Sequence, residues 1–402
     1  MLEKTSESKV LRDPIHEYIH IDDQLIWELL GTREVQRLKR IHQLGTTYQV
    51  YHTAEHSRFA HSLGVYEIVR RMVNEISGID DLLTPEDKLA VMAAGLLHDI
   101  GHGPFSHIFE TISQIHHEEI TKRIICEDSE VHRVLEKAKP GFSKVVASIL
   151  DHSHPKTILT QFVSSQLDAD RMDYLLRDAY FTGTSYGQYD IERILRTFKI
   201  SQDKLTIKES GIHSIEDYIM ARYHMYYQVY YHPVGRAVEA VLIGFFKRFN
   251  DLIKQDPSFI QAYPMFKNLT AQPNLNDFYH LDEAACFYGF HLASEDKDPI
   301  LKDLAKRFLN RDLFDYQDVS HEKERNLMRH KVEKAYDSRY YFYQDEMVSR
   351  PYTPYSGDGT IIYISCTDGS IKELSEVSNI VKAIVKAKSK DDKKVYFPKE
   401  IL

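Results

Sequence analysis

Hydrophobic and polar positions along the chain follow two different periods, which together predict a mainly α-helical protein with a few strands. Apolar and polar side chains alternate around residues 18–21, as is typical of a short strand or hairpin. Helices are predicted where apolar residues recur at helical spacing. The main segments are residues 24–30, 32–43, 143–150, 157–167, 214–250 (with a kink at Pro233) and most of 254–330, and a small hairpin is expected within 198–208.

A further apolar segment leads directly into an unusual pair of polar residues. Residues 89–95 are small or apolar on every side, which predicts a buried helix. His98 and Asp99 follow, and Gly101, Gly103 and Pro104 end the helix. Neighbouring His and Asp side chains at the end of a buried helix are costly unless something pairs with them, and a divalent metal ion is the simplest partner.

Two other predicted helices carry side chains that could bind the same ion. His61 shares helical spacing with Val65 and therefore faces the core. Ser57, four residues earlier, is a possible N-cap of this helix. Asp170, like the nearby Asp168, belongs to a third helix, which is too apolar to lie loosely on the surface. Each segment alone has an ordinary explanation: a satisfied core histidine for the first, a solvated helix rich in salt bridges for the other.

Together these segments supply two imidazoles and two carboxylates. This mixed set suits Fe, Mn, Zn or Ni rather than Ca. A metal ion held in this way lowers the pKa of a water and polarises a phosphoryl oxygen. Groups suited to proton transfer and to neutralising phosphate charge lie close in sequence: His102, His107, His117 and Glu118 for the first task, Arg58 and Arg171 for the second. The residues alone therefore predict metal-assisted phosphoester hydrolysis.

Composition narrows the range of partners and locations. The 402 residues carry a net charge of −9, which argues against a general nucleic-acid or membrane surface. The three cysteines have no metal-type spacing, the N-terminus has no apolar signal region, and no apolar run is long enough for a bilayer. A cytoplasmic protein is expected. Composition shifts after about residue 341, where a hairpin around Asp368-Gly369 and a helix over 374–388 are predicted, so we divide the chain into 1–340 and 341–402.

Longer strings point to one family. They are Asp13-Pro14-Ile15-His16, Gln36-Arg37-Leu38, Gln43-Leu44-Gly45, His56 to Val65 (HSRFAHSLGV), His98 to His107 and Asp168 to Tyr174 (DADRMDY). This ordered set resembles the HD-domain deoxynucleoside triphosphate (dNTP) triphosphohydrolases, bacterial relatives of the vertebrate SAM-and-HD-domain enzyme. The resemblance runs from about Lys9 to the C-terminus, and no SAM domain is expected before it. It implies a helical HD-domain core with a smaller C-terminal α+β region.

The resemblance also implies an activity and a set of residues for it. The family converts a dNTP and water into a deoxynucleoside and inorganic triphosphate, limiting dNTP pools. By similarity His61, His98, Asp99 and Asp170 are the metal ligands, which leaves Asp168 a structural or supporting carboxylate. The resemblance also allows Mg with the nucleotide phosphates. His107 matches the general acid, and His102, His117 and Glu118 match its supporting residues. Arg58 and Arg171 match phosphate contacts.

Sugar selection is assigned by the same resemblance. A Gln and an Asp bind the 3′-hydroxyl in the family, while a Leu and a Tyr crowd the 2′ position. The matching residues here are Gln43, Leu44, Tyr174, Asp178 and Tyr230. Arg222 matches another substrate-side residue. Tyr226 stands where the vertebrate enzyme has His, so contacts to the base are expected to differ.

The family is often a homotetramer with nucleotide activators bound between subunits. Lys9, Gln36 and Lys39 fall in the string that matches a guanine-nucleotide site, and Arg311 matches a phosphate contact at a second site. This chain departs from the pattern at three positions: Gly31 replaces an Asp, Lys39 an Arg and Asp315 a Lys. Because Lys cannot reproduce the bidentate fork of Arg, guanine specificity is not expected at the first site. We expect control by a dNTP or a reduced dependence on any activator.

Two other functions remain open. The first is another HD-domain nucleotide phosphohydrolase or phosphodiesterase, which would release monophosphate or orthophosphate. The second is a nucleotide-sensing protein that kept the fold without the reaction. The residues matched to sugar recognition disfavour the first, and the four filled ligand positions disfavour the second.

Overall fold

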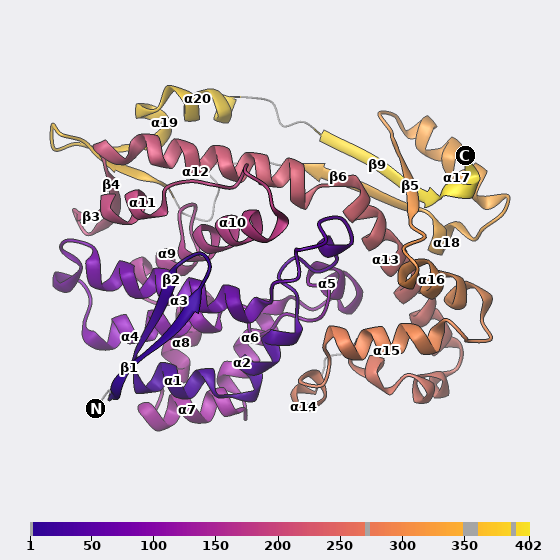
Figure 1. The fold of residues 1–402 in the computed structure, drawn as a ribbon, viewed down its shortest axis with the longest axis horizontal. Coiled ribbons are helices and arrows are strands. Elements are labelled where there is room, and N and C mark those ends of the chain that lie inside the picture. Colours follow the sequence, from indigo (N-terminus) through magenta and orange to yellow (C-terminus); the bar gives the residue numbers. More distant parts are fainter. Residues whose placement is uncertain (1–2, 270–273, 349–360, 387–390) are drawn as a thin grey trace.

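The structure is a computed structural model that describes residues 3–269, 274–348, 361–386 and 391–402. It is mainly α-helical, with three small sheets. In Figure 1 the N-terminal half occupies the left of the molecule and the long helix α13 leads to the right-hand part, where the C-terminus lies. The expected helical core with a smaller α+β C-terminal region is confirmed. The division at residue 340 stays a prediction.

A hairpin and two short helices come first. The strands β1 (Lys4–Asp13) and β2 (Glu17–Asp23) pair antiparallel and are followed by α1 (Gln24–Leu30), as predicted. The helix expected over 32–43 is shorter: α2 (Arg33–Arg37) tightens into a 3₁₀ turn over Leu38–Arg40. Its predicted apolar face is nevertheless correct, because Val35, Leu38 and Ile41 are all fully buried.

The helical core follows without interruption by strands. Its helices are α3 (Arg58–Glu75), α4 (Pro85–Leu97), α5 (His107–Ser113), α6 (His117–Cys126), α7 (Glu130–Ala138), α8 (Phe142–Leu150), α9 (Thr157–Val163) and α10 (Ala169–Thr182). Helix α4 is the predicted buried helix and begins at a capping box formed by Thr84 and Asp87. It packs between α3, α8 and α9, while α3 also packs against α10. These contacts bring the three polar segments of the sequence to one place.

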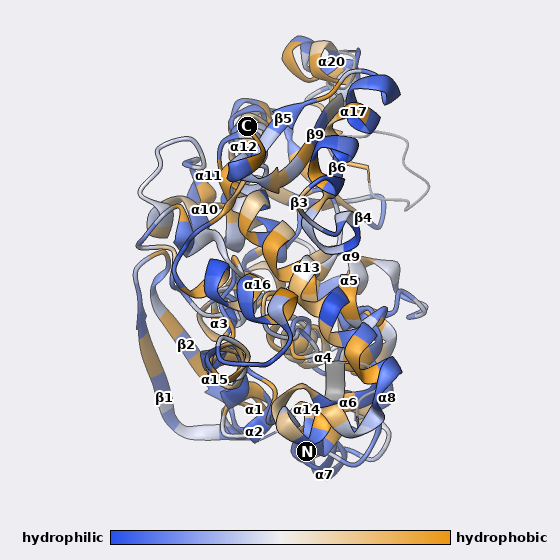
Figure 2. Cartoon of the chain, turned by 90° about the vertical axis from the view of Figure 1, so that its right-hand side faces the viewer, coloured by the Kyte–Doolittle hydropathy of each residue, from blue (hydrophilic) through white to orange (hydrophobic). Residues whose placement is uncertain are grey.

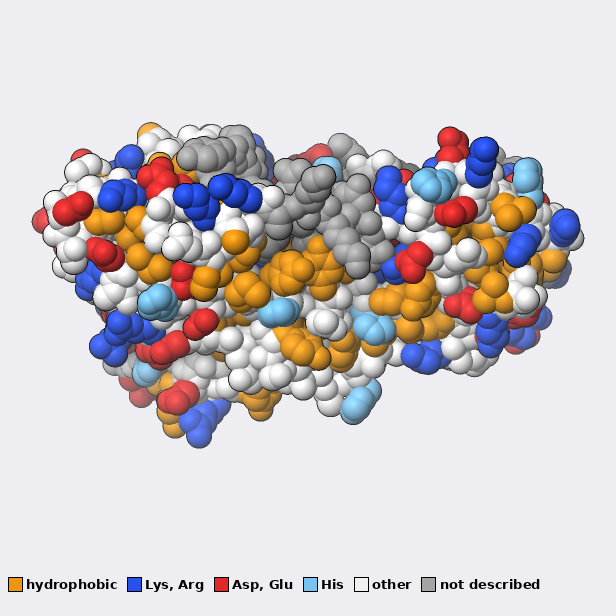
Figure 3. Space-filling view, turned by 90° about the horizontal axis from the view of Figure 1, so that it is seen from above, with side chains coloured by type: hydrophobic (Ala, Val, Ile, Leu, Met, Phe, Trp, Pro, Cys, Tyr) orange, Lys and Arg blue, Asp and Glu red, His pale blue; other side chains and the backbone are white. Residues whose placement is uncertain are grey.

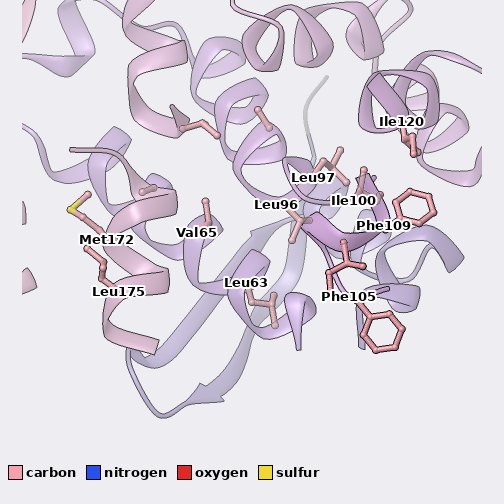
Figure 4. Packing of buried hydrophobic residues seen from close by; sticks show 14 of the residues in the cluster. Leu63, Val65, Leu96, Leu97, Ile100, Phe105, Phe109, Ile120, Met172 and Leu175 are labelled. Atoms are coloured by element: carbon pink, nitrogen blue, oxygen red, sulfur yellow. The ribbon is translucent and has the colours of Figure 1, made fainter. Parts of the chain in front are cut away.

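Apolar side chains fill the space around that place. Figure 4 shows them meeting from several elements, namely Leu63 and Val65 of α3, Leu96 and Leu97 of α4, Ile100, Phe105 and Phe109 after it, Ile120 of α6, and Met172 and Leu175 of α10. All ten are buried. The metal-competent side chains therefore stand in a close-packed, rigid surrounding.

Two close helix contacts depend on glycine. A Cβ atom on Gly64 of α3 would come 1.8 Å from Oδ1 of Asp173 on α10. A Cβ atom on Gly101 would come 2.2 Å from the carbonyl oxygen of His117. Both distances are far inside van der Waals contact, so α10 can approach α3, and α6 can approach the segment after α4, only because these positions lack side chains.

The second half of the chain adds further helices and short strands beside the core. It contains α11 (Ile191–Thr197), β3 (Phe198–Ser201), β4 (Lys204–Lys208), α12 (Ile212–Met225), α13 (Pro233–Gln255), α14 (Leu275–Phe278), α15 (Glu283–Ala293), α16 (Pro299–Leu309), β5 (Phe314–Asp318), α17 (Glu322–Glu333) and α18 (Ser338–Tyr341). The single kinked helix predicted over 214–250 is wrong. A π-helical turn over Tyr226–Tyr230 separates α12 from α13, and Pro233 starts the new helix because proline is best tolerated in a first turn.

The C-terminal strands join strands from the earlier part of the chain. In the four-stranded sheet, of order β3-β4-β7-β8, β7 (Tyr363–Ser365) pairs parallel with β4 and antiparallel with β8 (Ile371–Glu373). In the three-stranded sheet, β9 (Asp391–Pro398) lies between β5 and β6 (Tyr343–Val348). The predicted hairpin at Asp368-Gly369 is confirmed. The helix expected over 374–388 is divided into α19 (Leu374–Val377) and α20 (Asn379–Lys386), and residues 387–388 lie outside the described residues.

Hydrophobic and charged side chains are distributed unevenly over the surface. In Figure 2 helices such as α13 show mixed hydrophobic and hydrophilic faces, whereas α17 at the outer edge is mostly hydrophilic. Figure 3 shows hydrophobic side chains in a broken band across the middle of one face, with charged side chains toward both ends. No helix among the described residues combines the length and apolar character that a membrane span requires. The three cysteines are free thiols.

Candidate metal centre and neighbouring substrate pocket

Three helices place the predicted ligands together. His61 lies in the first turn of α3, His98 and Asp99 follow the last turn of α4, and Asp170 lies in the first turn of α10. Ligand atoms of His61, His98 and Asp99 lie within 4.8 Å of one another. Oδ1 of Asp170 lies 3.0 Å from Nε2 of His61 and 3.5 Å from Nε2 of His98. The four residues face one small space.

The ring orientations suit a metal ion. Nδ1 of His98 donates to the carbonyl oxygen of Gly95 at 2.9 Å, so its Nε2 carries the lone pair. That Nε2 is buried and has no hydrogen-bond partner in the described chain. Nδ1 of His61 lies 2.8 Å from Oδ2 of Asp173, which orients the ring with Nε2 toward Asp170. A carboxylate behind a histidine is the usual support of a metal-binding imidazole.

The electrostatics of the cluster favour positive charge there. Burial lowers the pKa of His61, but hydrogen bonds to Asp170 and Asp173 outweigh burial and raise the pKa to about 10. Burial raises the pKa of Asp99, but the charges of His98 and Arg58 outweigh it and hold the pKa well below its usual range. A divalent cation would satisfy the same carboxylates, so the donor set fits the Mn, Fe, Zn or Ni ion predicted.

Asp168 has a different position from Asp170. Its side chain accepts from the backbone N–H of Arg171 at 2.6 Å and caps helix α10. It also pairs with the guanidinium of Arg171, which in addition donates to the carbonyl oxygen of Ser165. The sequence alone left both aspartates open as ligands. The geometry favours Asp170, because Asp168 is used by the helix terminus.

The residues predicted for proton transfer lie beside the ligands. Nε2 of His102 is 3.3 Å from Oδ1 of Asp99, and its ring stacks on that of His117 at 3.7 Å. Burial and the nearby Arg58 hold the pKa of His102 well below its usual range. Nδ1 of His117 bonds to Glu110, while Glu118 is exposed. The side chain of His107, at the start of α5, lies outside the described residues.

A cavity of about 600 Å³ opens next to the ligands. His98, Asp99 and Asp170 line one side of it, and His117 and Glu118 line another. The predicted phosphate contact Arg58 is turned to Asp99, with Nη2 donating to Oγ of Ser106 at 2.8 Å. Solvent-sized molecules can therefore reach the ligands from the side of α6.

A second polar cluster adjoins the first and contains the residues predicted to contact the sugar. Nε2 of His56 lies 2.7 Å from one oxygen of Asp178, and the hydroxyl of Tyr230 donates to the other at 2.7 Å. The ring of Tyr174 lies 6.1 Å from that of Tyr230 and 6.4 Å from that of His61, so it joins the two clusters. We call His56, Tyr174, Asp178 and Tyr230 the sugar cluster.

Other predicted substrate residues lie around this cluster. Oε1 of Gln43 is buried and has no hydrogen-bond partner among the described residues, and Leu44 beside it is half-buried. Arg222 of α12 is buried, with its guanidinium 5.7 Å from the ring of Tyr226. The hydroxyl of Tyr218, one turn before Arg222, donates to the carbonyl oxygen of Gln166 at 3.0 Å.

The residues predicted for activator binding are spread over several elements. Lys9 on β1 pairs with Glu7, and Nε2 of Gln36 donates to the carbonyl oxygen of Leu30 at 2.6 Å. Lys39 lies 4.5 Å from the ring of Phe59, and Arg311, after α16, donates to the carbonyl oxygen of Gln49. In the part of the chain that the structure describes, no hydrogen bond or ion pair links these four residues to one another.

Several contributors were missing from the predicted site. Three hydrogen-bond partners were not predicted: Asp173 for His61, His56 for Asp178, and Gln166 for Arg222. Asp173 and His56 lie within strings that were already singled out, so their place in those strings was an available signal. Gln166 had no comparable signal, because its contact with Arg222 joins residues 56 positions apart.

Comparisons with known proteins agree with this geometry. The HD domain model matches residues 58–178, and the HD associated region model matches residues 189–338. The chain therefore belongs to the HD-domain family.

Its relatives include characterised and uncharacterised proteins. The uncharacterized protein YwfO of Bacillus subtilis is 45% identical over 99% of this chain and 94% of its own length. A deoxynucleoside triphosphate triphosphohydrolase SAMHD1 homolog of Dictyostelium discoideum is 30% identical over 61% of this chain and 50% of its own. The crystal structure of the phosphohydrolase BT4208 of Bacteroides thetaiotaomicron superposes with a TM-score of 0.82, at 30% identity, over 97% of this chain and 99% of that one. The chain is thus a member of a phosphohydrolase family with a site that could hold a metal ion.

Proposed function

We propose that the protein hydrolyses deoxynucleoside triphosphates to deoxynucleoside and inorganic triphosphate. The observation that carries the proposal is the junction of two clusters: Tyr174 lies between His61 of the metal ligands and Tyr230 of the sugar cluster. A nucleotide with its sugar beside Asp178 would extend its phosphates toward the ligands and toward Arg222. Relatives named as dNTP triphosphohydrolases support the same substrate.

Each set of residues has its own task. His61, His98, Asp99 and Asp170 would hold the divalent ion, which supplies Lewis acidity to a water and to a phosphoryl oxygen. Water adds to the α-phosphorus while the bond to the 5′-oxygen breaks. His107 gives that oxygen a proton, and His102, His117 and Glu118 support the transfer. Arg58, Arg171 and Arg222 balance the charge of the phosphates.

Sugar selection follows from the second cluster. Oε1 of Gln43 has a free lone pair for the 3′-hydroxyl, and Asp178 retains lone pairs beyond its bonds to His56 and Tyr230. Leu44 and Tyr174 leave little room at the 2′ position. A ribonucleotide would therefore place its additional hydroxyl against side chains that cannot pair with it. A homotetrameric, cytoplasmic enzyme with an activator nucleotide between subunits, at Lys9, Gln36, Lys39 and Arg311, completes the proposal.

The test is separation of products by anion exchange, with Mn and each dNTP, singly and in mixtures. Inorganic triphosphate from single dNTPs supports the reaction without a second nucleotide. Triphosphate only from mixtures supports the reaction and identifies the activator. Asp170→Asn is the matched control, because it keeps the size of the side chain and removes its charge. Monophosphate or orthophosphate as the product, or no product from protein that carries its metal, would contradict the proposal in favour of a phosphodiesterase or a sensor.

A further inference from the structure

Arg222 differs from the other buried arginines in how few of its donors are used. Arg177 donates from all three nitrogens to Asp13 and Asp173, and all three nitrogens of Arg37 donate to backbone carbonyl oxygens. Nη1 of Arg222 donates to Oε1 of Gln166 at 3.0 Å, and its Nε has no partner. No carboxylate among residues that the structure describes lies within ion-pair distance of it. A buried guanidinium without a carboxylate partner would be stabilised by an anionic ligand.

Gln166 holds one edge of that guanidinium. Its side chain is 8% exposed, in the short segment between α9 and α10. Its carbonyl oxygen accepts from the hydroxyl of Tyr218, one helical turn before Arg222. Gln166 is therefore bonded to α12 twice, once through the backbone and once through the side chain. The contact through Oε1 fixes the plane of the guanidinium and leaves its remaining donors for a ligand.

The segment that contains Gln166 is supported from behind by the C-terminal part of the chain. A small cavity of about 30 Å³ lies behind it, with room for about one water molecule. Its walls are residues 165–167, β4 and residues 361–363. β7 pairs with β4 here, and Oγ of Ser378 donates to Glu216 of α12 at 2.5 Å. Gln166 thus lies on a wall between α12 and this sheet.

We propose that Gln166 is a positioning residue for the phosphates of the substrate. By accepting from Nη1 it orients Arg222 so that Nε and Nη2 meet an anionic polyphosphate. The inference rests on the proposed function and names one determinant of its phosphate binding. Gln166 itself need not touch the substrate, since it acts through Arg222.

The experiment compares Gln166→Leu with the wild type in steady-state kinetics and in calorimetric binding of inorganic triphosphate. Leu keeps a similar volume and removes the acceptor. We expect KM for the dNTP and Kd for triphosphate each to rise about tenfold, the usual effect of losing one hydrogen bond to a charged group. We expect kcat to change by less than about threefold, because the metal ligands are untouched.

Two further variants separate positioning from general damage to the wall. Gln161→Leu makes the same substitution in the same small cavity, without contact to Arg222, and is expected to bind triphosphate as the wild type does. In a double-mutant cycle, Gln166→Leu should weaken triphosphate binding little further once Arg222→Ala is present. Additive losses in that cycle would mean that Gln166 acts by another route and would overturn the inference.

The results also separate the inference from the proposed function. Equal affinity for inorganic triphosphate in wild type and Gln166→Leu overturns the inference, even if dNTPs are hydrolysed. Binding of triphosphate that depends on Gln166, in a protein that releases no triphosphate from any dNTP, contradicts the proposed reaction alone. Wild-type protein that does not bind triphosphate overturns both.

Discussion

Helix α10 presents two carboxylates on one face with opposite surroundings. Asp170 faces the imidazoles of His61 and His98, and Nε2 of His98 has no hydrogen-bond partner. Asp178, two turns later, receives donors from His56 and Tyr230 on both of its oxygens. The first carboxylate belongs to a group of acceptors that a cation would complete. Each oxygen of the second carboxylate already accepts from one protein donor.

This difference teaches how to separate the roles of buried polar residues. Several acceptor groups gathered in one buried place favour binding of a cation, because burial makes every unsatisfied group costly. A carboxylate with its donors in place is held in one orientation and can position a neutral ligand. The metal ligands should therefore be sensitive to charge, and the sugar cluster to hydrogen bonds.

Loss of a metal ligand should have the largest effect. Removing only the hydrogen-bond partner of a ligand commonly costs about 10- to 100-fold, so Asp170→Ala should lower turnover by more than about a hundredfold. Metal content of the purified protein should fall below one ion per chain. Stoichiometric metal in this variant would identify Asp168 or another group as the ligand and would break the comparison.

The proposed general acid comes next. His107→Ala should slow turnover by roughly a hundredfold while metal content and substrate affinity stay near wild type. Single-turnover kinetics with one dNTP would measure the chemical step directly. Near-normal turnover would show that His107 does not protonate the leaving 5′-oxygen and would remove it from the proposed mechanism.

The carboxylate behind His61 should give an intermediate effect. Asp173→Asn keeps the shape but removes the charge that orients Nδ1 of His61, and Asp173 also binds Arg177. Metal affinity is expected to fall about 10- to 100-fold, measured by competition with a chelator. Unchanged affinity would show that packing alone orients the ring.

The sugar cluster should respond more weakly. Tyr230→Phe removes the hydroxyl that donates to Asp178 at 2.7 Å and leaves the ring in place. Loss of one such hydrogen bond costs about 1–1.5 kcal/mol, so KM for a dNTP should rise by up to about tenfold with full metal content. A loss of metal in this variant would mean that the two clusters are not separate.

The smallest expected effect concerns His42. This residue directly precedes Gln43, which is a predicted contact of the sugar. The ring of His42 is hydrogen-bonded to Glu283, and its backbone N–H donates to the same carboxylate at 3.0 Å. Burial lowers the pKa of His42, but the contacts with Glu283 outweigh burial and raise it above its ordinary value.

A raised pKa in the folded state means that the protonated form stabilises the fold. This stabilisation is complete below the unfolded pKa of about 6.5 and is lost as pH rises through the folded pKa. His42→Gln should therefore lower the free energy of unfolding more at pH 6 than at pH 9. Urea unfolding of both proteins at both pH values measures the difference, and equal losses would contradict the pKa assignment.

Much of the fold, and the grouping of the four predicted metal ligands in one place, could be predicted from the sequence. Helix α4, its end at His98 and the core position of His61 follow from local periodicity and from glycine positions. The break between α12 and α13 could not be predicted as such, because proline at 233 fits a kink and a new helix equally well. The partners of Arg222 and Asp178 depend on how distant segments pack, which no local pattern encodes.

The parallel pairing of β4 with β7 has a consequence for the order of folding. Glu209, just after β4, holds the backbone of Thr367, 158 residues later in the chain. Contacts between such distant positions form late, because closing a long loop costs conformational entropy before the contacts can stabilise the fold. During synthesis, residues 58–178 leave the ribosome long before β7 exists. A nascent chain can therefore bring His61, His98, Asp99 and Asp170 together first and acquire the wall behind Gln166 only after β7 has been synthesised.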